Sequence, residues 1–230
     1  VTAVADPGYH FVNWSDGSTA NPRTDTNVMA NLSVTASFAP DTVTHSIALY
    51  PGWNLVSFNV HPADTSVAAV LSSIAGNYDL VYAWDATGAH ASSGNWLKAD
   101  NIPYSPDSLT ALNEAMGFWI HMTAADTLEV QGTVPTSTEI SLLTGAGGWN
   151  LVSYPSSVNR TLPGALQDFG VETDFSLIYA YHVNETADPW KLFDRNTPAF
   201  ANDLAELTPG WGYWVKVSEN KVWNVNYTAP

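Results

Sequence analysis

The 230-residue chain carries 7 Lys and Arg against 22 Asp and Glu, a formal charge of −15, and it contains no cysteine. This acidity repels nucleic acid and anionic membrane surfaces, and the lack of cysteine excludes disulfides, thiolate metal sites and cysteine nucleophiles. No segment reaches 18 uninterrupted apolar residues, so no membrane insertion is expected. The ten Trp and ten Tyr stand out against only 13% charged residues. Those rings must lie in cores or on a binding face.

Residues 1–42 alternate short β-prone runs with Gly, Asn, Asp and Pro turns, which predicts a small β segment. A GY.F..W pattern followed by a closing V.A.FA is carried by Gly8, Tyr9, Phe11, Trp14, Val34, Ala36, Phe38 and Ala39. This pattern resembles the second half of the InlB-type B-repeat, a β module found in tandem in bacterial surface proteins. The resemblance implies a partial B-repeat-like segment and an extracellular setting, secreted or attached to the cell surface.

The remainder of the chain is a tandem duplication. PGWNLVSFNV at 51–60 returns as GGWNLVSYPS at 147–156, and VYAWD at 81–85 returns as IYAYH at 178–182. The matches predict two homologous units, 46–133 and 140–227, joined by the Thr, Pro and Ser of TVPTSTE. These GWNLVS…GYWI units also resemble a tandem module of large secreted or envelope-attached bacterial and archaeal proteins. That resemblance implies other domains of the same polypeptide as partners.

Each unit reads as strands around one short helix. WNLVSF predicts a buried strand, and 62–76, with Pro early and Gly at its end, predicts a helix that LPGALQDFG shortens in the second unit. A hairpin and two further strands follow. We therefore expect a mainly β fold of the β-sandwich kind: two tandem homologous antiparallel β units, each with one short helix, plus the N-terminal β segment.

Counting inward from the hairpin loops places aromatic residues opposite each other. The count pairs Trp84 with Trp96 in the first unit and Tyr181 with Trp190 in the second. Alternation in the next strand separates Phe118, Ile120 and Met122 from Trp119 and His121, as it separates Tyr213, Val215 and Val217 from Trp214 and Lys216. Because Lys216 belongs to a residue type that is rarely buried, the face of Trp119 and Trp214 should be partly solvated.

Catalytic signals are weak throughout the sequence. Ser57 and Ser153 lie in no GxSxG elbow, and the six histidines form no HExxH pair. Of the carboxylates, only Asp100 and Asp194 recur between the units. We therefore predict no catalytic residue, no enzyme and no cofactor. Calcium is the ion that oxygen-rich turns such as 183–189 could ligate, but no DxDxDG spacing is present and solvated loops are the favoured explanation.

The duplication sorts the aromatic residues by expected role. Trp53 and Trp149 sit in the repeated strand and should be core, as should Trp223, which replaces Leu128. Trp211, which replaces Met116 in a turn, should be an exposed ring specific to the second unit. The hairpin pairs, like Trp119 and Trp214, are open between packing and ligand binding. The candidate ligand-binding residues are Trp84, Trp96, Trp119, Tyr181, Trp190, Trp211 and Trp214.

These residues lead to two functional hypotheses. The first is a non-catalytic accessory module of a secreted multidomain bacterial protein that binds a neutral polysaccharide or glycan, since pyranose C–H faces stack on Trp and Tyr. The second is a structural spacer or adhesin segment of a cell-surface protein, in which the rings fill two small cores and bind no small ligand.

Overall fold

The computed structural model describes residues 1–6, 8–100, 107–169 and 175–228, and the chain divides into two compact units, Val1–Val43 and Thr44–Pro230. The predicted fold class is confirmed, because the structure is mainly β, with two four-stranded antiparallel sheets and few short helices.

The N-terminal unit is built on one antiparallel strand pair, β1 (Tyr9–Trp14) with β2 (Ala36–Pro40). Phe11 lies opposite Phe38 in this pair, with their ring centroids 6.1 Å apart. Trp14 is buried, and its indole N–H donates a hydrogen bond of 2.8 Å to the Ala20 carbonyl. These aromatic side chains are among those on which the predicted B-repeat pattern rests.

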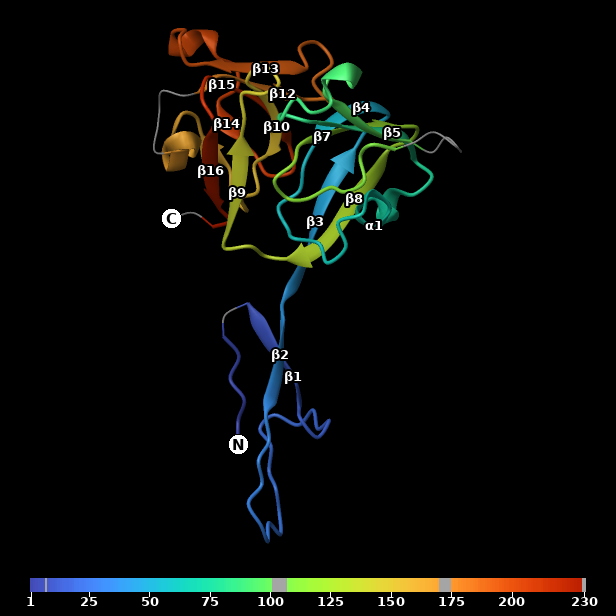
Figure 1. Ribbon diagram of the computed structural model, residues 1–230, viewed down its shortest axis with the longest axis vertical. Helices are drawn as coiled ribbons and strands as arrows, with labels where there is room; N and C mark the ends of the chain where they lie inside the picture. Colours follow the sequence, from blue (N-terminus) through green and yellow to red (C-terminus); the bar gives the residue numbers. More distant parts are fainter. Residues whose placement is uncertain (7, 101–106, 170–174, 229–230) are drawn as a thin grey trace. The chain divides into compact units, whose positions relative to one another are not determined.

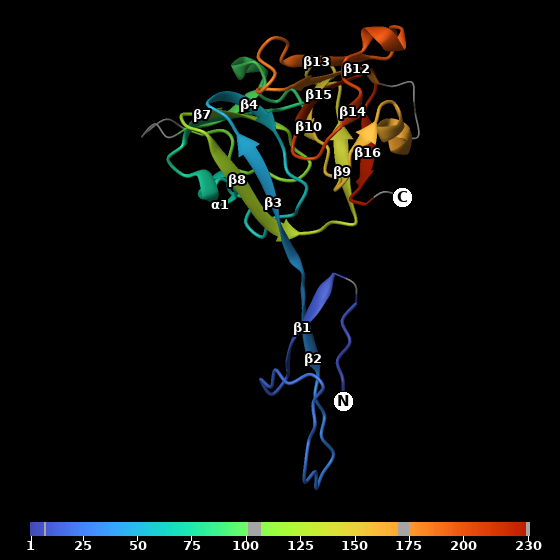
Figure 2. The same cartoon turned by 180° about the vertical axis from the view of Figure 1, so that it is seen from behind.

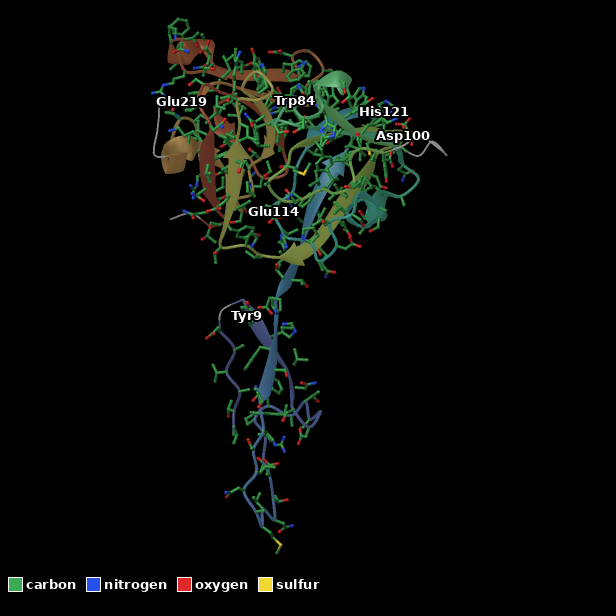
Figure 3. The ribbon with its side chains drawn as sticks, viewed as in Figure 1. Tyr9, Trp84, Asp100, Glu114, His121 and Glu219 are labelled. Atoms are coloured by element: carbon green, nitrogen blue, oxygen red, sulfur yellow. The ribbon has the colours of Figure 1, made fainter. Side chains whose placement is uncertain are left out.

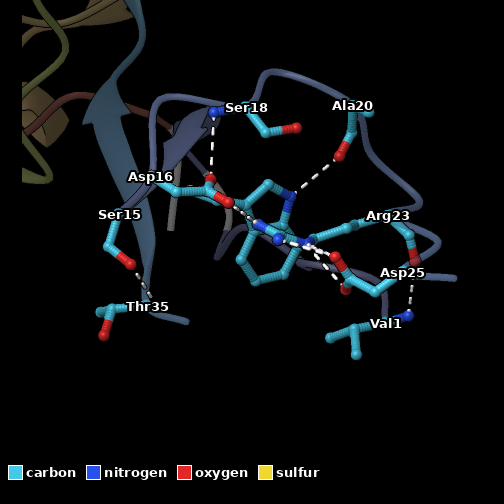
Figure 4. Close-up of polar contacts among 9 residues, drawn as sticks. Val1, Ser15, Asp16, Ser18, Ala20, Arg23, Asp25 and Thr35 are labelled. Atoms are coloured by element: carbon cyan, nitrogen blue, oxygen red, sulfur yellow. Dashed lines mark hydrogen bonds and ion pairs between the residues drawn. The ribbon is translucent and has the colours of Figure 1, made fainter. Parts of the chain in front are cut away.

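Arg23 ties the loop of this unit to Trp14 (Figure 4). Its guanidinium lies 5.9 Å from the centre of the Trp14 ring and donates hydrogen bonds to both carboxylate oxygens of Asp25, from Nε at 2.9 and 2.8 Å and from Nη2 at 2.7 Å. A third contact joins its Nη1 to Asp16 at 2.8 Å. The hydrogen bonds from Arg23 lower the pKa of Asp25. A charged cluster over one indole thus takes the place of a large core in this short unit.

The compact unit Thr44–Pro230 contains both repeats, and each repeat forms a four-stranded sheet with the same strand order. The first has the order β4-β7-β5-β6, formed by β4 (Gly52–Val56), β7 (Phe118–Met122), β5 (Tyr78–Trp84) and β6 (Trp96–Asp100). The second has the order β10-β15-β12-β13, formed by β10 (Trp149–Ser153), β15 (Gly212–Val217), β12 (Phe175–Tyr181) and β13 (Trp190–Asp194). A shift of register before Leu80 recurs before Leu177. The two repeats share one topology, as the sequence alignment predicts.

Each repeat also has a two-stranded ribbon (Figures 1 and 2). The first pairs β3 (Thr42–Leu49) with β8 (Asp126–Thr133), and the second pairs β9 (Ser137–Leu142) with β16 (Lys221–Asn226). Strand β9 covers the last residues of the predicted junction TVPTSTE, which therefore begin the second repeat. A further short pair joins β11 (Arg160–Thr161) to β14 (Glu206–Leu207).

The helices are shorter than expected. They are α1 (Val67–Val70) and the 3-10 turns η1 (Ser72–Ile74), η2 (Ala91–Ser93), η3 (Gly164–Phe169) and η4 (Ala199–Ala201). The helix predicted over 62–76 is wrong in its first part, because the Thr65 carbonyl instead accepts a hydrogen bond from Leu112 N at 2.8 Å. Gly170, the last residue of the second predicted helix, lies outside the described residues.

A separate hydrophobic core lies within each repeat, built from residues of its sheet and its ribbon. In the first repeat Phe118, Ile120 and Met122 of β7 are buried, while Trp119 and His121 face the other way. The predicted alternation is therefore confirmed. Trp223 is buried in the second core as predicted, and its ring stacks on Tyr154 with centroids 6.1 Å apart.

The two repeats contact each other through equivalent segments. Single antiparallel bridges join Val56 to Trp211 and Val152 to Met116, and each is the counterpart of the other under the duplication. The backbone N–H of Ser57 donates to Gly210 at 3.0 Å, while that of Ser153 donates to Ala115 at 3.2 Å. Contacts that occur in both directions define a pseudo-twofold axis between the repeats, as in a symmetric dimer.

Two glycines allow this approach. A Cβ added to Gly117 would lie 2.6 Å from the Val152 carbonyl oxygen, and one added to Gly212 would lie 2.9 Å from the Val56 carbonyl oxygen. The two carbonyl oxygens belong to backbone and cannot move aside by a change of rotamer, although at Gly212 the added Cβ would also meet the Leu55 side chain at 2.9 Å. Glycine is therefore required at both positions for the repeats to touch.

We predict that Gly117→Ala and Gly212→Ala each lower the free energy of unfolding by about 1–3 kcal/mol, the cost of overpacking. Gly164→Ala is the matched control, because its Cβ would meet only the Thr161 hydroxyl, at 3.8 Å. Urea unfolding followed by tryptophan fluorescence measures all three. Equal stability of Gly117→Ala and Gly164→Ala would contradict the close approach.

Candidate functional site

Aromatic side chains gather on the sheet faces that point away from the two cores. Each repeat supplies five, at equivalent positions, and none of them is buried. We call this set the aromatic surface; its members are Trp53, Tyr82, Trp84, Trp96 and Trp119 from the first repeat and Trp149, Tyr179, Tyr181, Trp190 and Trp214 from the second. Trp84, one of the residues labelled in Figure 3, lies on β5.

The rings contact one another across the pseudo-twofold axis. Trp119 of the first repeat lies 5.1 Å from Tyr181 and 5.8 Å from Trp190, measured between ring centroids. The equivalent Trp214 lies 5.1 Å from Trp84 and 5.7 Å from Trp96. The two sheets thus form one continuous aromatic surface.

Contacts within each sheet hold the same rings in place. Both hairpin pairs predicted from the sequence are confirmed, since Trp84 lies opposite Trp96 and Tyr181 lies opposite Trp190. Their ring centroids are 5.1 and 5.2 Å apart, in edge-to-face geometry. Each ring is therefore fixed by several others and does not need a ligand to become ordered.

Two cavities open on the aromatic surface. The larger, of about 660 Å³, is lined by Trp53, Tyr82, Ser93, Trp96, Trp119, Tyr181, Trp190 and Trp214. The smaller, of about 460 Å³, is lined by Trp84, Trp96, Trp149, Tyr179, Trp190 and Trp214. Both lie in the size range of small-molecule sites, and their walls offer ring faces for stacking.

The edges of these rings can form hydrogen bonds. Within the described residues, no protein group hydrogen-bonds the hydroxyls of the three tyrosines or the indole N–H of Trp119 and Trp214. Trp84 differs, because its N–H donates to the Trp149 carbonyl at 2.8 Å and so joins the repeats. The aromatic surface combines apolar faces with free polar groups, which suits a ligand that is itself amphipathic.

The structure corrects the role assigned to Trp53 and Trp149. They are not core: Trp53 is 37% exposed, Trp149 is half-buried, and both belong to the aromatic surface. Trp53 lies opposite His121 on the outward face of its sheet and stacks on Tyr82, with centroids 5.9 Å apart. The strand is buried through Asn54, Leu55 and Val56 instead.

Trp211 is half-buried and not the exposed ring that we expected. It packs against the second core, with the ring of His182 only 3.6 Å away between centroids. It lines a separate cavity of about 230 Å³, which shares Tyr181 with the aromatic surface. Its backbone bridge to Val56 explains this position, since the turn that carries Trp211 is pressed against the first repeat.

The other six predicted ligand-binding residues are brought together in the aromatic surface. Sequence reasoning missed Tyr82 and Tyr179 as candidates. Each stands two positions before a predicted member, Trp84 or Tyr181, on the same strand, and so shares its face. This period-two signal could have identified both.

Asp85 organises the hairpin tip that supplies Ser93 to the larger cavity. Its carboxylate accepts hydrogen bonds from Thr87 N at 2.9 Å, Thr87 Oγ1 at 2.5 Å and His90 N at 3.1 Å, and lies 2.7 Å from His90 Nδ1. Burial raises the pKa of Asp85, but these hydrogen bonds outweigh it and bring the pKa to about 2. The ionised carboxylate therefore holds the loop in shape.

Acidic side chains of the oxygen-rich turn over 183–189 form ion pairs with the ammonium group of Lys191. Glu185 lies 2.9 Å from Lys191 Nζ and 2.9 Å from His182 Nδ1, while Asp188 lies 3.7 Å from the same lysine. Across the described part of the chain, no group of three or more His, Cys, Asp or Glu side chains is placed to hold a metal ion. The helices described there are too short or too polar to cross a membrane.

We predict that Asp85→Asn lowers the free energy of unfolding by about 1–2 kcal/mol at pH 7, because an amide replaces the anionic acceptor. Since the folded pKa lies below the unfolded value of about 3.9, this contribution is complete above about pH 5 and fades as the pH falls through 4 toward 2. Urea unfolding at pH 7, 4 and 2.5 measures it. Asp188→Asn, at an exposed carboxylate, is the control. A difference between Asp85→Asn and the parent that does not shrink with acid would refute the assignment.

Comparison with known families assigns the N-terminal unit. Residues 1–42 match the model of the divergent InlB B-repeat domain, which confirms the resemblance seen in the sequence for this segment. No curated protein and no solved structure matches the chain. InlB B-repeat domains occur in surface and secreted bacterial proteins, so the chain carries a module of that class of protein.

Proposed function

We propose that the compact unit Thr44–Pro230, which contains both repeats, is a non-catalytic module that binds neutral carbohydrate on the aromatic surface. The observation that carries this proposal is the meeting of ten Trp and Tyr side chains from both repeats in one partly exposed surface with two cavities. A surface patch of this size and composition is typical of an interaction site.

The chemistry of the aromatic surface favours a sugar over a purely apolar ligand. A pyranose ring presents C–H groups on its faces and hydroxyls at its rim, and each face that stacks contributes about 0.5–1.5 kcal/mol by analogy with aromatic pairs. The tyrosine hydroxyls and indole N–H groups at the ring edges can then bond the sugar hydroxyls.

The charge of the protein favours a neutral glycan over an anionic one. With a formal charge of −15, the protein repels acidic polysaccharides at long range, whereas uncharged chains approach freely. The B-repeat over residues 1–42 is consistent with display of the module on a secreted or surface protein, where such glycans are met.

The same B-repeat favours a second candidate function. In a spacer or adhesin segment, the repeats would form a rigid connection between other domains and would bind no sugar. In that case the aromatic surface serves only to join the two sheets. The two functions differ in whether any soluble glycan is bound.

We predict that at least one polysaccharide binds among hydroxyethylcellulose, xylan, galactomannan, mixed-linkage β-glucan and soluble starch. Trp96→Ala and Trp190→Ala should each weaken binding by between about twofold and tenfold, because these rings line both cavities. Affinity electrophoresis and quenching of tryptophan fluorescence measure the effect, and a reducing-end assay should detect no cleavage.

Phe200→Ala is the matched control, since Phe200 is 91% exposed and lines neither cavity. Its affinity should equal that of the parent. The midpoint of urea unfolding, measured for every variant, separates loss of binding from loss of folding. If none of the five polysaccharides changes either signal, the carbohydrate function is refuted and the spacer function is favoured.

A further inference from the structure

The two cavities of the aromatic surface are counterparts under the pseudo-twofold axis. Trp53, Tyr82 and Tyr181 line the larger cavity, and their equivalents Trp149, Tyr179 and Trp84 line the smaller one. The first two residues of each set come from one repeat and the third comes from the other. Each cavity therefore needs both repeats to be complete.

The cavities also share walls. Trp96, Trp190 and Trp214 line both, so the two spaces meet at the same three indoles. A ligand that fills one cavity already touches rings of the other. An extended ligand can therefore pass from one to the other without leaving the aromatic surface.

The rings are inclined to one another and form no flat platform. Neighbouring rings meet at 87° for Trp53 and Trp119, 87° for Trp96 and Trp214, and 88° for Trp149 and Trp214. A flat crystalline polysaccharide could lie against only a few of these faces at once. A single flexible chain, by contrast, can present successive sugar rings to faces of different orientation.

We propose that the aromatic surface binds one free, water-soluble glycan chain across both repeats, with the two cavities as two subsites of one site. This inference rests on the carbohydrate function proposed above and adds the form of the ligand. Once one part of a chain occupies the first subsite, binding of the next part to the second is intramolecular. Such linkage raises affinity by about 10²- to 10⁴-fold over a ligand that fills one subsite.

The test is a calorimetric titration of the full chain with oligosaccharides of one to six residues that have the backbones of the five polysaccharides. In the series that binds, we expect the hexasaccharide to bind at least about 10²-fold more tightly than the disaccharide, with one chain per protein. Affinity that does not rise with length, or two chains per protein, would overturn the proposal. Tighter binding of the protein to insoluble microcrystalline cellulose than to soluble hydroxyethylcellulose would also overturn it.

Equivalent variants on the two sides of the axis sharpen this test. Trp53→Ala, which removes a ring from the larger cavity only, and Trp149→Ala, which removes the equivalent ring from the smaller cavity only, should weaken hexasaccharide binding to a similar extent, and each should reduce the dependence on length. Phe200→Ala should keep it. Loss of the length dependence without a change in disaccharide affinity distinguishes bridging from a general loss of structure, and an effect of only one of the two variants would contradict bridging.

These results can be separated from the outcome for the carbohydrate function. If no polysaccharide binds, both proposals fall. If a polysaccharide binds but affinity does not rise with oligosaccharide length, the carbohydrate function stands and only the two-subsite arrangement is refuted.

Discussion

The close backbone approach at Gly117 and Gly212 is the constraint on which the arrangement of the two repeats depends. At these points the end of each GWNLVS strand meets the GFW or GYW turn of the other repeat. Because the contact occurs twice in equivalent form, it fixes a pseudo-twofold relation between two sheets that each have a core of their own. The sheets then present their outward faces side by side, and Trp119 and Trp214 reach the rings of the opposite repeat.

Because of this symmetry, recurrence of a residue in both repeats does not distinguish a core position from a position on the aromatic surface. Recurrence in both copies predicts a core role for Trp53 and Trp149, and the difference from Met116 predicts an exposed ring at Trp211. That reasoning fails for Trp53 and Trp149, because a surface built by two copies around an axis repeats its own functional positions as well as its core. It fails in the opposite sense for Trp211, whose difference from Met116 accompanies packing against the second core.

Features that depend only on residues close in the sequence, such as hairpin pairing and strand alternation, could be predicted from local patterns. The pairing of Trp84 with Trp96 follows from the length of one loop, and the alternation in β7 follows from strand geometry, so both could be derived from the sequence. The alternating Ile47, Leu49, Ile140 and Leu142 could have predicted the ribbon strands β3 and β9. The meeting of the repeats could not be predicted, because it depends on contacts such as the one between Val56 and Trp211, which lie far apart in the sequence and which no local pattern encodes.

The two ends of the aromatic surface differ chemically although its centre is symmetric. At one end the ammonium of Lys216 lies 5.2 Å from the centre of the Trp149 ring and covers part of that indole. At the other end the equivalent residue is His121, which lies 2.7 Å from Asp79 and leaves Trp53 37% exposed. A chain bound across both repeats would meet the indole of Trp53 beside a histidine ring at one end and the cation-covered indole of Trp149 at the other. The duplication thus places equivalent aromatic residues on both sides of the axis, and the exchange of His121 for Lys216 makes the two ends chemically different.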